Sequence, residues 1–219
     1  MATAHIPLYE REGDKNGYLG YQYKHWIRYQ FTYGKWIKAG IMASQDAGEP
    51  FFAGKNKWGY DYVSPYFLMR DCGKLKALAL GRYRLRFGMG IVMNSSFSLG
   101  KQASISSLGR SSQGIFAHSS RQEYNYMQGV AATVEVVRHL DLTGFVSYRK
   151  IDATLNNDDN SISTILKTGY HRTISEMSRR RNASQTIAGG NVRYHNNGFH
   201  LGAKHDGKDI VVVFLLLHI

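Results

Sequence analysis

Five basic residues in one short segment are the part of this sequence best suited to chemistry. Alternate positions of an extended chain share a face, so the segment places its cations on one side and its apolar residues on the other. Rings of arginine and lysine side chains favour anions in a pore. We therefore predict a lumen-facing, anion-binding row that consists of Lys74, Lys76, Arg82, Arg84 and Arg86.

Two other roles stay open for this basic row. The commoner role of such residues is structural, here pairing with lumen carboxylates such as Glu135 or Asp141. The other is nucleic-acid binding, because basic side chains interleaved with Tyr83 and Phe87 could follow a phosphate backbone and stack bases. These two aromatic residues alternate with the arginines and therefore belong to the opposite face, which weighs against the nucleic-acid role.

Motifs for catalysis are missing from the sequence. It contains no Gly-x-Ser-x-Gly elbow, no phosphate loop and no His-Glu-x-x-His pair. Cys72 is the only cysteine, so neither an intrachain disulfide nor a cysteine-based zinc site can form. The histidines at 195, 200 and 205 alternate in face and favour a chance group, and the acidic stretch 156–160 favours a solvated loop over a calcium site. We expect a protein that is not an enzyme and has no metal or cofactor.

The charge of the chain is strongly positive and the apolar runs are short. A formal net charge of +12 in 219 residues suits nucleic acid, anionic lipid or an anion-attracting channel as partner. No run reaches the roughly 18 to 20 apolar residues of a transmembrane helix. The start lacks the features of a signal peptide, and we expect the exported protein to carry one that is missing here.

Alternation of apolar and polar residues predicts the elements that position the basic row. Between Tyr21 and Tyr33 the odd positions are aromatic or apolar apart from His25, and most of the even positions are polar. A strand with one face toward lipid and the other toward a wet lumen has this period of two. We predict eight strands, at about 19–33, 36–46, 57–70, 74–92, 123–137, 140–152, 185–195 and 198–206.

The connections between these strands alternate in length. Tight turns are expected at Gly34-Lys35, at 71–73, at Arg138-His139 and at 196–198, and long loops at about 47–56, 93–122 and 153–184. Short turns on one side and long loops on the other are typical of outer-membrane barrels. Within the third long loop, Thr173 and Glu176 match a capping box and predict a short helix.

Six short strings of the sequence, taken in order, carry a resemblance to a known family. They are Ile6–Arg11, Tyr23–Trp26, Ser44–Pro50, Gly81–Gly90, Asn94–Lys101 and Thr168–Thr173. They resemble the barrel region of a Bacteroidetes family of helix-hairpin-helix domain-containing proteins. The resemblance covers roughly residues 5–205 and implies an outer-membrane-like β region. The helical hairpins of the family are missing from this chain, so DNA binding is not implied.

Together these patterns predict an all-β fold, an antiparallel meander of about eight strands that forms part of an outer-membrane β-barrel. We divide the chain into an N-terminal extension (1–18), a barrel segment (19–206) and an atypical apolar tail (207–219). The expected function is a porin-like pore or surface scaffold with a basic lumen. Its expected partners are outer-membrane lipid and the remainder of the barrel. The alternatives are a soluble basic β domain that binds nucleic acid and a periplasmic carrier of carbohydrate or lipid.

Overall fold

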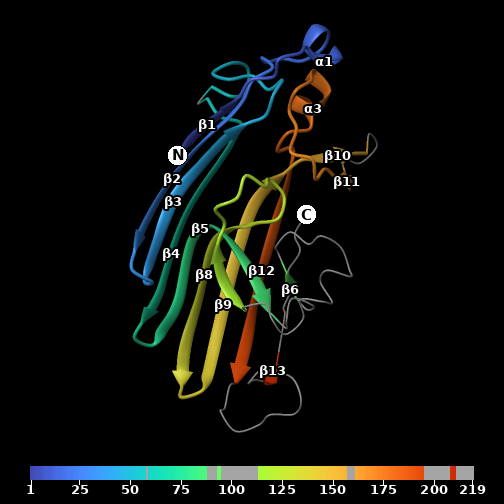
Figure 1. The fold of residues 1–219 in the computed structure, drawn as a ribbon. Coiled ribbons are helices and arrows are strands. Elements are labelled where there is room, and N and C mark those ends of the chain that lie inside the picture. Colours follow the sequence, from blue (N-terminus) through green and yellow to red (C-terminus); the bar gives the residue numbers. More distant parts are fainter. Residues whose placement is uncertain (58, 88–92, 95–112, 157–160, 195–207, 211–219) are drawn as a thin grey trace, which may run out of the picture.

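One curved antiparallel sheet dominates the computed structural model (Figure 1). The structure describes residues 1–57, 59–87, 93–94, 113–156, 161–194 and 208–210. Neighbouring strands follow the order β1-β2-β3-β4-β5-β8-β9-β12-β13, and β6 and β7 pair with β5. The predicted all-β antiparallel meander is confirmed.

The long strands lie where the alternating pattern predicts them. They contain 9 to 13 residues. A tilted strand needs about 9 to 11 residues to cross a bilayer, so each of them is long enough. Their bounds are β2 (Lys24–Tyr33), β3 (Ile37–Gln45), β4 (Tyr62–Cys72), β5 (Leu75–Phe87), β8 (Met127–Val137), β9 (Leu140–Ile151) and β12 (Ala183–Tyr194). The predicted strand at 198–206 lies outside the described residues, and β13 (Lys208–Ile210) pairs with β12.

Shorter elements occupy the N-terminal extension and the long loops. The capping box is confirmed, because the Thr173 hydroxyl accepts a hydrogen bond from the Glu176 backbone N–H at 3.2 Å at the start of α3. The sequence did not predict the strands inside the loops. The short elements are β1 (Ala2–His5), α1 (Glu12–Lys15), β6 (Met93–Asn94), β7 (Gly114–Ala117), β10 (Ala153–Leu155), β11 (Ile162–Ile165) and α3 (Ile174–Ser178).

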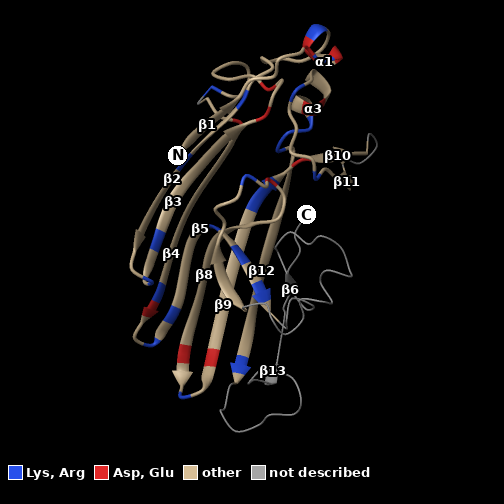
Figure 2. Cartoon of the chain, viewed as in Figure 1, with Lys and Arg blue, Asp and Glu red and all other residues tan. Residues whose placement is uncertain are grey.

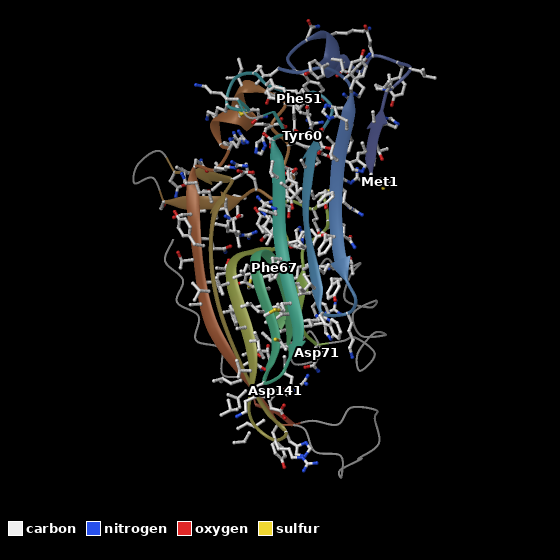
Figure 3. The ribbon with its side chains drawn as sticks, turned by 90° about the vertical axis from the view of Figure 1, so that its left-hand side faces the viewer. Met1, Phe51, Tyr60, Phe67, Asp71 and Asp141 are labelled. Atoms are coloured by element: carbon white, nitrogen blue, oxygen red, sulfur yellow. The ribbon has the colours of Figure 1, made fainter. Side chains whose placement is uncertain are left out.

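Tight turns and long connections lie at opposite ends of the sheet (Figure 1). The β8–β9 turn contains only two residues beyond the Val137–Leu140 pair, and His139 reaches a positive φ of 71° there. In Figure 3, Asp71 and Asp141 lie toward the turn end, Phe51 and Tyr60 lie at the loop end, and Phe67 lies between them. We call these the turn end and the loop end.

Strand β5 leaves the wall of the sheet at Gly81. Its last pair with β4 is Tyr66–Gly81, and from Tyr83 to Arg86 the same edge of β5 pairs with β7 instead. Gly81 has a φ of +83°, and a Cβ there would lie 2.6 Å from the Pro65 carbonyl oxygen. Only glycine fits such a position without strain. The end of β5 and β7 therefore fold into the concave side of the sheet.

This inward segment carries the hydrophobic core. Tyr83, Leu85 and Phe87 are buried and pack toward Ala131 and Phe145 of the wall. The Tyr83 hydroxyl donates to the Val146 carbonyl at 2.8 Å. The concave side is thus filled by protein along this part of the sheet.

The convex side carries continuous apolar rows. Strand register aligns Phe31, Ala39, Phe67, Leu80, Val130, Val146 and Ala188 across the sheet from β2 to β12. The next row toward the turn end is Tyr33, Ile37, Met69, Leu78, Ala132, Gly144 and Gly190. Phe31, Leu80, Val130 and Val146 are each 40% exposed or more.

The rows on the concave side are more polar. One of them joins Arg70, Ala77, Thr133, Thr143 and Asn191, and the hydroxyls of Thr133 and Thr143 lie 2.9 Å apart. Figure 2 shows that the middle parts of β8, β9 and β12 carry no charged residue. In the middle of the sheet the outer face is therefore uncharged and apolar, whereas the inner face combines this polar row with the core residues Leu68, Ala79, Ala131 and Phe145.

Among the described residues, no helix has the length and apolarity needed to cross a membrane.

Candidate functional site

The predicted basic row does not lie on one face of a regular strand. Arg82, Arg84 and Arg86 lie on the inward segment, past the bend at Gly81. Lys76 falls at a bulge, because the pairing with β8 shifts between Leu75 and Ala77. Two irregularities therefore determine where these cations lie, and neither follows from alternation.

The two lysines of the row differ from the arginines. The Lys76 ammonium lies 2.6 Å from the Glu135 carboxylate. This ion pair is the structural alternative to an anion-binding role for Lys76. Lys74 is exposed at the turn end, where its carbonyl accepts a hydrogen bond from the Glu135 backbone N–H. Neither lysine shares an environment with Arg82.

Arg82 is held between two aromatic rings. Its guanidinium carbon lies 4.5 Å from the centroid of the Tyr62 ring and 4.3 Å from that of Tyr126. Arg82 as a whole is only 7% exposed. Its Nε and Nη1 atoms have no hydrogen-bond partner among the described residues. A buried cation with free donors is costly unless something else binds it.

Arg149 joins Arg82 from β9, two strands away from β5 in the same sheet. It lies on β9, is 8% exposed, and stacks on Tyr126 at 5.1 Å from the ring centroid. Its Nη1 donates to the Tyr124 carbonyl and its Nε to the Gln185 side chain at 2.9 Å. The sequence reasoning missed Arg149, although its inward position follows from the same period of two.

A second group of charges lies at the loop end. The imidazole of His171 is bonded on both sides, with Nδ1 2.6 Å from Asp61 and Nε2 3.0 Å from Asp152. Arg180 Nε lies 3.1 Å from the other Asp61 oxygen, and the Glu49 carboxylate accepts from the His171 backbone N–H at 3.0 Å. We call these five residues the rim cluster.

Burial and charge shift the pKa values of the rim cluster. Burial alone would lower the pKa of His171, but the hydrogen bonds to Asp152 and Asp61 outweigh it and raise the pKa to about 10. Burial would raise the pKa of Asp61, yet the bond to His171 and the charge of Arg180 lower it. Burial, together with the Asp61 charge, raises the pKa of Glu49 to about 7.

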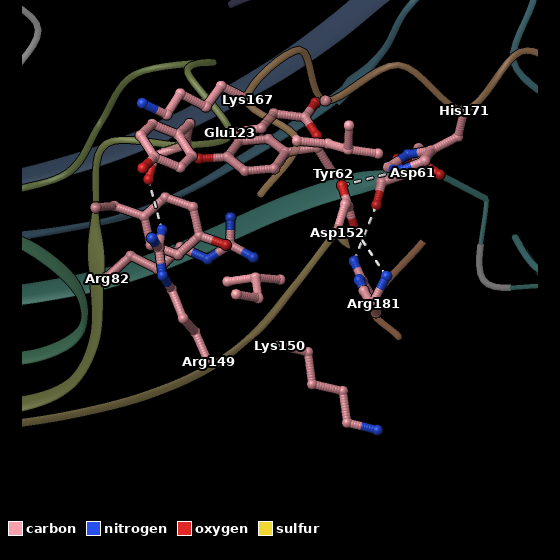
Figure 4. Close-up of a pocket in the computed structure, with 15 residues that line it drawn as sticks. Asp61, Tyr62, Arg82, Glu123, Arg149, Lys150, Asp152, Lys167, His171 and Arg181 are labelled. Atoms are coloured by element: carbon pink, nitrogen blue, oxygen red, sulfur yellow. Dashed lines mark hydrogen bonds and ion pairs between the residues drawn. The ribbon is translucent and has the colours of Figure 1, made fainter. Parts of the chain in front are cut away.

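These contacts make the rim cluster a tie between loops. It joins the β3–β4 loop, the start of β4, the end of β9 and the segment before α3 (Figure 4). With both ring nitrogens donating to carboxylates, His171 has no lone pair left to act as a base. The cavity beside it is about 40 Å³, far below the roughly 300 Å³ or more of a ligand pocket.

Metal binding would require the rim cluster to rearrange. Ligand atoms of Glu49, Asp61 and His171 lie within 4.8 Å of one another, a spacing that a cation could bridge. A metal at either His171 nitrogen, however, would displace Asp61 or Asp152 from a short hydrogen bond. The histidines predicted as a chance group, at 195, 200 and 205, lie outside the described residues.

Comparison with protein-family models, curated protein sequences and solved structures gives no match. The geometry alone therefore defines the candidate site. It consists of the interior cations Arg82 and Arg149, with Arg84 and Arg86 further along β5, and the rim cluster closes it at the loop end. The sequence analysis identified the three arginines of β5. It did not identify the rim cluster, because its residues form no recognisable motif.

Proposed function

We propose that this chain is a segment of an outer-membrane β-barrel that serves as a surface scaffold with a basic interior and performs no catalysis. The observation that carries the proposal is the apolar outer face. In a soluble protein the outer face would expose apolar rows to water from β2 to β12, whereas lipid is the matching solvent for them.

Aromatic residues at both ends of the apolar rows support the same environment. Tyr33 and Trp36 lie at the turn end with ring centroids 5.9 Å apart, and both are exposed. At the loop end, His25, Phe51 and Tyr60 pack edge to face at 4.8 to 5.2 Å. Aromatic girdles of this kind occur at the two interfaces of membrane barrels.

The filled interior favours a scaffold over an open pore. Tyr83, Leu85 and Ile115 of the inward segment are at most 2% exposed, so they occupy space that a channel would need. Nucleic-acid binding is disfavoured by the ring contacts of Arg82. The rings of Tyr62 and Tyr126, which could stack bases, already stack on Arg82.

Membrane integration tests the proposal. The chain, refolded into phosphatidylcholine vesicles, should float with them in a sucrose gradient and remain bound after alkaline carbonate washing. As a matched pair, Val130→Asp should abolish flotation because it places a charge on the outer face, whereas Thr133→Asp on the inner face should not. Recovery of the unaltered chain in the soluble fraction would contradict the proposal.

A further inference from the structure

The departure of β5 from the wall leaves a lateral cleft. Beyond Gly81, no described strand bridges β4 to β8, and a cleft of about 640 Å³ lies there. Val63 and Pro65 of β4 line one side, and Gln128 and Tyr148 line the other. Arg82 and Arg149 lie on its lining, so the cleft connects the outer face with the basic interior.

The lateral cleft has an excess of positive charge. Asp61 is its only carboxylate among the described lining residues, and it is already bound by His171 and Arg180. The remaining cations make no ion pair with a carboxylate in the described part of the chain. They are Lys55, Arg82, Arg149, Lys150 and Arg181.

Arg82 brings two unpaired hydrogen-bond donors to the lining of the cleft. It is buried and fixed by two tyrosine rings, and its Nε and Nη1 find no acceptor among the described residues. The Nε and Nη1 hydrogens point to different sides of the planar guanidinium, so each of these donors can bind a separate anion oxygen. Phosphate oxygens would satisfy the donors that the protein leaves unpaired.

The opening of the cleft is lined by exposed apolar residues of the outer face. Val63 and Tyr148 are 36% and 54% exposed and belong to the apolar outer face. Val146 lies two residues before Tyr148 on β9, belongs to the same face and is 55% exposed. An anion on these arginines that also carried acyl chains would place the chains along this apolar surface.

We propose that the lateral cleft binds a phosphate-bearing lipid from the surrounding membrane, with its headgroup on Arg82 and Arg149 and its chains along Val63, Tyr148 and Val146. The inference rests on the proposed membrane function and adds a ligand to it. The phosphate enters sideways through the wall, past Lys150 and Arg181, which border the cleft nearer the loop end.

Native mass spectrometry of the chain in a neutral maltoside detergent tests this site. Dioleoyl phosphatidic acid should be retained, and dioleoyl phosphatidylcholine and dioleoylglycerol should not. Arg82→Gln and Arg149→Gln should each weaken retention roughly tenfold, the value of one charged hydrogen-bonding group. Arg193→Gln is the matched control, because Arg193 pairs with Asp141 at 3.2 Å outside the cleft. Lys150→Gln, on an exposed residue, gives a second variant if a buried substitution prevents folding.

Three results would overturn the inference. Equal retention by Arg82→Gln, Lys150→Gln and the unaltered chain would exclude the cleft as the site. Displacement of the lipid by inorganic phosphate at a similar concentration would indicate a site for free anion. Displacement by a short single-stranded oligonucleotide would indicate nucleic acid. Vesicle flotation of the same preparation separates the two proposals, because a chain that floats but retains no phosphatidic acid keeps its membrane function and loses only this ligand.

Discussion

The rim cluster and the lateral cleft share Asp61 and Arg180, yet they treat charge in opposite ways. At the rim, every carboxylate that contacts His171 is matched by a short bond, and the network ties loops from distant parts of the chain. In the cleft, Arg82 keeps donors without partners among the described residues. Paired charges of this kind hold a structure together, while unpaired ones are retained at a cost that binding can offset.

The largest effect that we expect comes from removing the centre of the rim cluster. His171→Leu should cost about 3 to 5 kcal/mol, because Asp61 would remain buried with one of its three side-chain partners gone. Urea unfolding in detergent, followed by tyrosine fluorescence, measures the change. His25→Leu is the control, since His25 packs on aromatic rings and forms no ion pair within the described residues. A loss below about 1 kcal/mol would show that the cluster is not a tie.

The pH dependence of stability should distinguish the rim from the cleft. The folded pKa of His171 is raised from 6.5 to about 10, so its contribution is complete below about pH 6.5 and is lost as pH rises toward 10. The raised pKa of Glu49, about 7, acts in the same direction between pH 4.5 and 7. The lowered pKa values of Asp61 and Asp152 remove stability only in acid, as pH falls below about 4.

We therefore expect the loop end to be most stable near pH 5 and to weaken toward alkaline pH. Hydrogen exchange at the His171 backbone amide, compared with that of Thr133 in the wall, measures the effect. In His171→Gln the alkaline loss should flatten. An unchanged alkaline slope in that variant would assign the dependence to other groups.

The bend that opens the cleft can be tested at Gly81. Gly81→Ala should cost about 1 to 3 kcal/mol, because alanine is strained at a φ of +83° and its Cβ would meet the Pro65 carbonyl. Gly144→Ala is the matched control, since nothing lies within 4 Å of a Cβ at that wall position. Urea midpoints in the same detergent give the difference. Equal midpoints for the two variants would show that the bend does not depend on glycine.

The smallest stability effect should come from Arg82. Arg82→Met keeps much of the volume between Tyr62 and Tyr126 and removes a buried cation with unpaired donors, so we expect a change within about 1 kcal/mol. Unfolding in lipid-free detergent is the measurement. A loss as large as that of His171→Leu would mean that Arg82, like the rim, is held by internal pairing.

Alternation alone predicted most of the wall. From β2 to β12 each long strand has one face that is packed or polar and another that is apolar. Successive side chains of a strand point to opposite faces, so this difference is visible in the sequence as alternation. It failed at Lys76 and Gly81, where a bulge and a positive φ change the direction of side chains within one strand. It also missed β7, because Gly114–Ala117 is too short to show a period.

The rim cluster was beyond reach of the sequence for a different reason. Asp61 and His171 are separated by 110 positions, and Asp152 approaches the other side of the ring from a third segment. Single acidic residues in loops are ordinary on a solvated surface, so nothing in their spacing marks Asp61 as buried or Asp152 as half-buried. Only the folded sheet, by bringing the loop ends together, gives them a common partner.

The position of β7 also has a consequence for the order of assembly. The inward segment, which consists of the end of β5 and β7, follows β4 in the chain and precedes β8, β9 and β12. It lies against the inner side of β4, where Ser64 donates to the His118 carbonyl. If strands are added in the order of synthesis, the inward segment is in place before β8, β9 and β12 pack against it. No loop then has to thread into a finished cavity.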